Sequence, residues 1–94
     1  MSDARMDRMR RWLEQVCAEL GIDPAVLDET TDELLAMVAT VAHGPSRPGA
    51  PLSAFLVGLA VGSAVPGLDP TTTSRAVSER IEAVERLAAS WASS

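Results

Sequence analysis

Hydrophobic residues recur every three or four positions along three stretches of the chain, which is the spacing of helices that bury one face. The first series consists of Met6, Met9, Leu13, Val16, Cys17 and Leu20. The second consists of Leu34, Leu35, Val38, Val41 and Ala42. The third consists of Val77, Ile81, Val84, Ala88 and Trp91. Each series predicts one amphipathic helix, with Gly21 ending the first, Gly44 ending the second and Asp69-Pro70 starting the last.

A fourth stretch, from Pro51 to about Val65, is apolar on every side of a helix. It is shorter than the roughly twenty residues needed to cross a bilayer, and a helix apolar all round is usually a buried central one. Gly58 and Gly62 share a face on which another backbone could approach closely. We therefore expect this helix to be the most buried element, with Phe55, Gly58 and Gly62 at packing or interface contacts. Because three short helices can hardly surround it, any uncovered part would suit a homodimer.

Turn signals complete the predicted fold. Asp23-Pro24 predicts one extra helical turn, and Thr30 followed by Glu33 has the spacing of a capping box. No stretch alternates with a period of two, so no strand is expected. The sequence predicts a single all-α domain over residues 1–94. It would be a compact bundle of four main helices and a short extra turn, with the apolar third helix at its centre and antiparallel neighbours.

Composition and charge narrow the possible functions. The chain has 94 residues, 47% of them hydrophobic, which excludes a disordered chain. Its net charge of −5 is the wrong sign for a protein that binds nucleic acid through the phosphate backbone. The N-terminus has no apolar run behind its positive charges. We therefore expect a cytoplasmic protein that binds neither nucleic acid nor membrane.

The sequence contains few residues able to support catalysis or metal binding. It has one histidine, His43, and one cysteine, Cys17, so no usual zinc site can form within one chain. Ser63, in "VGSAV", lacks the strand–turn–helix context of a nucleophile elbow. We predict no catalytic residue, no metal and no cofactor, and favour a non-enzymatic role.

The segment from His43 to Ser53 allows two interpretations. His43 suits the negative end of the second helix dipole, so it can be purely structural. Alternatively, His43, Arg47 and Ser53 bind an anion together with free N–H groups at the start of the third helix. We prefer the structural interpretation, because no glycine-rich phosphate loop accompanies these residues.

The basic patch near the N-terminus and the two tryptophans each allow two interpretations. The basic patch of Arg5, Arg8, Arg10 and Arg11 is expected to pair with the acidic cluster of Asp28, Glu29, Asp32 and Glu33. Binding of a partner is the alternative. Trp12 and Trp91 are either core residues or interface anchors.

Three stretches, "WLEQVCAELGID", "VAHGPSRPGAPLSAFLVGLAVG" and "ERLAASWA", are similar to a small actinobacterial family of uncharacterised helical domains. The resemblance extends over nearly the whole chain and is most specific in the second stretch. Members occur alone or fused to molybdenum cofactor guanylyltransferases. The resemblance thus implies a context in molybdenum cofactor metabolism. It implies no catalytic residue, and the glycine-rich nucleotide loop of the transferase is absent from this sequence.

These observations lead to three functional hypotheses. The first is a non-enzymatic accessory module that binds other proteins, among them a molybdenum cofactor biosynthesis protein or a second copy of the chain. The second is a small-molecule or anion-binding domain that uses the His43–Arg47 loop. The third is a regulatory or antitoxin-like helical protein, for which the negative charge argues against direct DNA contact.

Overall fold

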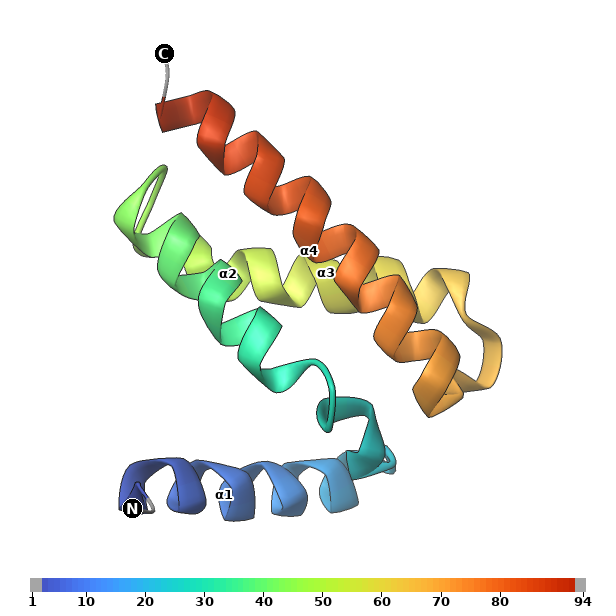
Figure 1. Ribbon diagram of the computed structural model, residues 1–94. Helices are drawn as coiled ribbons and strands as arrows, with labels where there is room; N and C mark the ends of the chain where they lie inside the picture. Colours follow the sequence, from blue (N-terminus) through green and yellow to red (C-terminus); the bar gives the residue numbers. More distant parts are fainter. Residues whose placement is uncertain (1–2, 93–94) are drawn as a thin grey trace.

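The computed structural model describes residues 3–92, and within this range it contains helices and turns but no strand, which confirms the all-α prediction (Figure 1). The four α-helices are α1 (Ala4–Leu20), α2 (Thr31–His43), α3 (Gly49–Ala64) and α4 (Pro70–Ala92). Two short 3₁₀ helices precede α2 and α4, namely η1 (Pro24–Leu27) and η2 (Pro66–Leu68). The extra turn expected after Asp23 is therefore present as η1.

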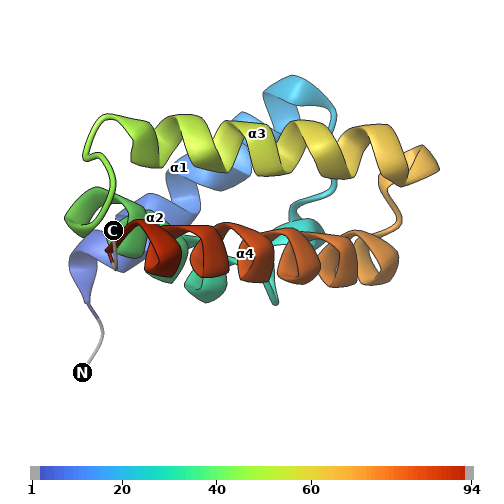
Figure 2. The same ribbon diagram turned by 90° about the horizontal axis from the view of Figure 1, so that it is seen from above.

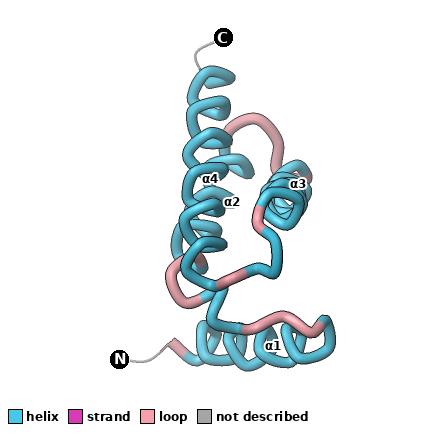
Figure 3. Tube along the Cα trace, turned by 90° about the vertical axis from the view of Figure 1, so that its right-hand side faces the viewer, coloured by secondary structure: helices cyan, strands magenta, loops and turns pink. Residues whose placement is uncertain are grey.

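Helices α2, α3 and α4 form the body of the molecule. Helices α2 and α4 lie side by side and run in the same direction, and α3 crosses behind both of them (Figures 1 and 2). Helix α1 lies across one end of this unit and contacts the rest of the chain mainly through η1 (Figure 3). No helix in residues 3–92 is both long and apolar enough to span a membrane.

The hydrophobic core lies between α2, α3 and α4, and α1 contributes nothing to it. Its fully buried members are Met37, Val41, Ala50, Val57, Val61, Val65, Ala76, Val77 and Ile81. Most of these side chains are small, so the three helices can approach closely, and Met37 is the only one of them that is both large and completely buried. The sole buried residue of α1 is Cys17, which lies outside this core.

Two helix-end signals predicted from the sequence are present in the structure. Gly21 ends α1 with φ of +70°, and its successor Ile22 donates its N–H to the carbonyl of Cys17 at 2.8 Å. A left-handed φ of this kind strains any residue with a Cβ, which explains the glycine. Asp23 accepts a hydrogen bond from the N–H of Ala25 at 2.9 Å and so caps η1 as expected.

The capping box predicted from Thr30 and Glu33 is wrong. The Thr30 hydroxyl donates instead to the carbonyl of Val26 at 2.7 Å, and its side chain is buried. Glu33 accepts a hydrogen bond from the Ser78 hydroxyl at 3.0 Å, which joins the first turn of α2 to α4. Thr30 is still the N-cap of α2, and its carbonyl accepts from the N–H of Leu34 at 2.9 Å, but its hydroxyl bonds back to η1 rather than to the helix N-terminus.

The prediction that α3 is the most buried element is also wrong. Its large side chains Leu52, Phe55, Leu56 and Leu59 are exposed by 56–63%. A Cβ added at Gly58 or Gly62 would meet nothing within 4 Å outside the helix's own backbone, so neither glycine marks a close approach within the chain. Helix α3 crosses α2 and α4 on one side only, and its opposite side is left uncovered.

Candidate functional site

The loop between α2 and α3 is held by its own hydrogen bonds. The N–H groups of Gly44 and Ser46 both donate to the carbonyl of Val41, at 3.3 and 3.1 Å. The Ser46 hydroxyl accepts from the N–H of Gly49 at 3.1 Å and thereby caps α3. As a result α3 begins at Gly49, two residues before the start predicted at Pro51.

This geometry removes the backbone donors that the anion-binding hypothesis needs. The free N–H groups of a helix belong to its cap and its first three residues. Here Pro48 and Pro51 have no N–H, Gly49 donates to Ser46, and Ala50 donates to the carbonyl of Arg47 at 3.2 Å. Leu52, where free donors were expected, already lies in the second turn. The N-terminus of α3 therefore offers no free N–H group to an anion.

The side chains proposed for that site are not brought together by any interaction in residues 3–92. His43 and Arg47 are exposed, and Ser53 is half-buried one turn inside α3. Arg47 makes no ion pair in this range. His43 occupies the last turn of α2, where a basic side chain faces the negative end of the helix dipole.

The arginines of α1 pair with acids of their own segment rather than with the acidic cluster. Arg5 lies 3.9 Å from Asp3, and Arg10 lies 3.5 Å from Asp7. Both pairs are exposed and each contributes between about 0 and 1 kcal/mol. Arg8 and Arg11 have no ion-pair partner within residues 3–92. The pairing expected with the acidic cluster is therefore wrong for the described part of the chain.

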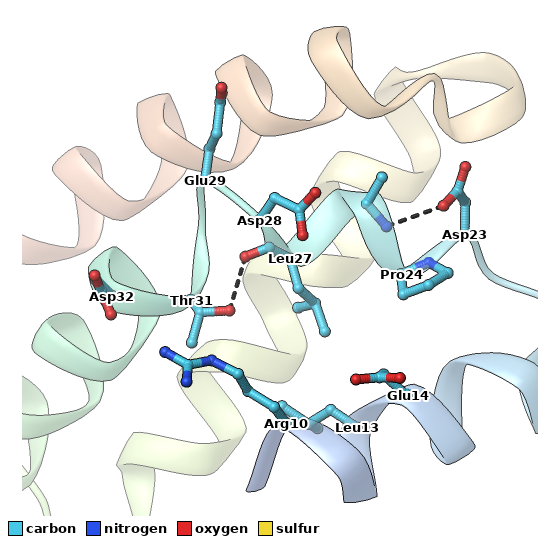
Figure 4. A pocket seen from close by; sticks show the side chains of 11 residues that line it. Arg10, Leu13, Glu14, Asp23, Pro24, Leu27, Asp28, Glu29, Thr31 and Asp32 are labelled. Atoms are coloured by element: carbon cyan, nitrogen blue, oxygen red, sulfur yellow. Dashed lines mark hydrogen bonds between the residues drawn. The ribbon is translucent and has the colours of Figure 1, made fainter. Parts of the chain in front are cut away.

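An open cleft of about 710 Å³ separates α1 from η1 and the start of α2 (Figure 4). Arg10 reaches from α1 toward the side of Thr31, whose hydroxyl donates to the carbonyl of Leu27 at 2.8 Å. The acids that line the cleft are Glu14, Asp23, Asp28, Glu29 and Asp32. They are too dispersed to form a metal site, and no group of three potential ligands is found in the described residues. The negative lining disfavours an anionic ligand.

Two exposed apolar surfaces remain as candidates for binding. The α1 face consists of Arg8, Trp12, Val16 and Leu20, which follow one another every four residues along one side of α1. Trp12 and Leu20 are 62% and 65% exposed and border a shallow groove on this side. The α3 face consists of Leu52, Phe55, Leu56 and Leu59. Trp91 is 60% exposed near the end of α4. Neither tryptophan is a core residue, and an interface role for them stays a prediction.

Of the α3 face, only Phe55 was predicted from the sequence as a packing or interface residue, although the signal for the other three residues is present. Along α3, the residues that face the core are Ala50, Ala54, Val57 and Val61. Those that face outward are the four larger residues of the α3 face. Both sets are apolar and both have helical spacing, so the period alone cannot separate them. The difference in side-chain size could have done so.

The fold and its surfaces define a small all-helical domain with exposed apolar faces and, in the described residues, no group of three potential metal ligands. The family described as a domain of unknown function, DUF6457, matches residues 4–94, and the chain belongs to this family. Among curated proteins and solved structures, none matches the chain.

Proposed function

We propose that this domain is a non-enzymatic interaction module that binds other proteins through its exposed apolar faces. The observation that carries the proposal is the exposure of nine large hydrophobic side chains within the described residues, both tryptophans among them. Scattered exposed apolar residues are normal, but side chains grouped on one helix face mark binding surfaces. The α1 and α3 faces are two such groups.

The partner we propose is a molybdenum cofactor guanylyltransferase or another protein of that biosynthetic route. The support is the resemblance to actinobacterial helical domains that are fused to such transferases, because fusion brings the two units together on one chain. A separate copy of the domain would reach the same enzyme by binding it. This proposal places the protein in the cytoplasm and includes a dimeric form.

The α1 face is the surface we assign to this partner. Tryptophan and arginine are the residues most enriched among those that dominate binding energy, and Trp12 and Arg8 are neighbours one turn apart. The rest of the chain holds α1 mainly through η1, so the opposite side of α1 is accessible. Arg8 has no ion-pair partner in residues 3–92, and it adds a positive charge to an otherwise acidic molecule. The matching partner surface is apolar with an acidic rim.

The test is titration calorimetry between the purified chain and the purified guanylyltransferase of the same organism. We expect a saturable complex that Trp12→Ala weakens at least about tenfold, which corresponds to about 1.4 kcal/mol. Leu87→Ala is the matched control, because Leu87 is 61% exposed but lies on α4. The absence of a complex would refute the proposed partner. A complex weakened by Leu87→Ala and not by Trp12→Ala would refute the assignment to the α1 face.

A further inference from the structure

We infer that the α3 face is the contact surface for a second copy of this chain. The inference rests on the proposed interaction function and adds to it by naming what binds the α3 face. It differs from the partner assignment in using α3 rather than α1. The distribution of side-chain size around α3 is the first observation that supports it.

Helix α3 places its small side chains inward and its large ones outward. Ala50, Val57 and Val61 are 2–4% exposed, whereas Leu52 and Phe55 are 63% and 62% exposed. A surface helix normally has the reverse arrangement, with its largest apolar residues in the core and polar residues outside. Burying a side chain of this size is favourable, and the chain alone leaves most of that contribution unused. The outward side of α3 thus has the residue composition of an interface.

The chain exposes more surface area than is typical of a compact monomer of its mass. The chain exposes 6672 Å², whereas a compact monomer of 9.9 kDa exposes about 5,200 Å². Its radius of gyration is 13.9 Å, against about 12 Å expected for 94 residues. The excess of about 1,500 Å² exceeds the roughly 800 Å² that each partner buries in a stable dimer. The chain as a whole therefore exposes enough excess area for a dimer interface, and the exposed side chains of the α3 face are part of that area.

Charge favours a second copy as the occupant. Residues 48–68 contain no charged side chain, although the whole chain has a net charge of −5. Two copies repel each other wherever their acidic surfaces meet, so an uncharged face is where self-association meets the least repulsion. Gly58 and Gly62 are also exposed, on a flank of α3, with open space beyond them. They allow the backbone of a second helix to approach closely at that point.

The same charge pattern disfavours a lipid surface. Helices that lie on membranes combine an apolar face with lysine and arginine residues that attract anionic headgroups. Helix α3 has neither residue, and the acidic body of the protein repels an anionic bilayer. A twofold dimer needs only that the same uncharged patch meets itself, which the α3 face satisfies.

Sedimentation velocity of the full chain over a range of concentrations tests the inference. We expect a monomer–dimer equilibrium in which Leu59→Glu raises the dissociation constant at least about tenfold. In the separated chains the glutamate is exposed on a helix it suits, so circular dichroism should remain helical. In the dimer two buried carboxylates would face each other, which is unfavourable. Phe55→Glu is the second variant and should act in the same way.

Leu87→Glu serves as the matched control, because it places the same charge at an equally exposed leucine of α4. It should leave the dissociation constant unchanged, and Trp12→Ala should do the same. A chain that stays monomeric at every concentration would overturn the inference, and so would a dimer that only Leu87→Glu dissociates. Sedimentation of the chain with phosphatidylcholine–phosphatidylglycerol vesicles, abolished by Leu59→Glu, would also overturn it. None of these outcomes depends on the guanylyltransferase, so the proposed function is tested separately.

Discussion

Helices α3 and α4 pack into the same core but differ on their outer sides. Helix α4 is a typical surface helix: Val77 and Ile81 are buried, and Glu82 and Arg86 are exposed. Helix α3 is apolar on both sides, with large residues outside. The outer side of α4 carries charged residues as well as Leu87 and Trp91, whereas the outer side of α3 is uncharged and apolar. Two helices with equal shares of one core can therefore have opposite relations to solvent.

The largest expected effect comes from introducing a glutamate on the inner side of α3, compared with a glutamate on its outer side. Val57→Glu would bury a carboxylate in the hydrophobic core cluster, at a cost that exceeds the marginal stability of a small domain. We expect this variant to lose its helical circular dichroism. Phe55→Glu, two residues away, should keep the helical signal of the parent. Equal loss of helicity in both variants would show that the outer side of α3 is also buried.

The corresponding pair on α4 should differ by a few kcal/mol. Ile81 is 2% exposed, so Ile81→Ala should lower the free energy of unfolding by about 2–5 kcal/mol. Leu87→Ala, at an exposed position, should change it by no more than about 0.5 kcal/mol. Urea unfolding followed by circular dichroism measures both values. A large effect at Leu87 would mean that the outer side of α4 is covered.

A substitution at Gly58 distinguishes the open environment seen in the structure from the close helix packing predicted from the sequence. Close helix contacts at this glycine would make any added side chain destabilising. In the structure a Cβ at Gly58 meets nothing within 4 Å. Gly58→Ala should therefore raise the free energy of unfolding of the monomer by roughly 0.5–1 kcal/mol, because alanine is the better helix former.

The comparison for Gly58→Ala is Gly21→Ala. Gly21 has φ of +70°, so an alanine there should destabilise by about 1–2 kcal/mol despite equal open space. Both variants are measured by urea unfolding in the Leu59→Glu background, which by the proposed α3 contact should keep the chain monomeric. A destabilising Gly58→Ala in that background would restore the close-packing interpretation.

The smallest expected effect is at Asp69, which precedes α4. Hydrogen bonds from the Thr72 N–H at 3.1 Å and the Thr72 hydroxyl at 3.0 Å lower the pKa of Asp69. Because its pKa is lower in the folded state, the carboxylate stabilises the fold above its ordinary pKa. This stabilisation is lost as the pH falls through the folded-state pKa. Asp69→Asn should slightly destabilise the domain at neutral pH, and the difference from the parent should vanish in acid.

Urea unfolding at neutral pH and at a pH below the ordinary aspartate value measures this difference. Thr72→Val removes the hydroxyl but keeps the backbone donor, so its effect at neutral pH should lie between those of the parent and Asp69→Asn. A difference between parent and Asp69→Asn that is constant with pH would contradict the role of the ionised carboxylate.

The helices of this domain can be predicted from the sequence wherever one face is polar. The stripes of α1, α2 and α4 have a helical period, and Gly21 and Asp23 act locally, so their effects follow from neighbouring residues. The orientation of α3 cannot be obtained in that way, because an apolar helix has no polar side to indicate which face meets the core. The start of α3 was misplaced because Pro48, Gly49 and Pro51 are typical of a loop, whereas Ser46 caps a helix that includes two of them.

The candidate sites show the same limit. A histidine and an arginine separated by a short loop are compatible with anion binding, and only the backbone shows that Gly49 and Ala50 already donate elsewhere. The prediction that the basic patch pairs with the acidic cluster was wrong. Such pairing depends on how α1 lies against η1, which no local sequence pattern specifies. The two tryptophans could be placed at a core or an interface only after their exposure was known.

The most direct test of the second copy on the α3 face uses the single phenylalanine of the chain. Phe55 gives a unique aromatic signal, so a sample mixed from isotope-labelled and unlabelled chains can be examined by isotope-filtered nuclear Overhauser spectroscopy. We predict contacts between the Phe55 ring of one copy and the methyl groups of Leu52, Leu56 or Leu59 of the other. Intermolecular contacts confined to residues of α1 or α4, or none at concentrations where the chain is dimeric, would contradict the assignment of the α3 face.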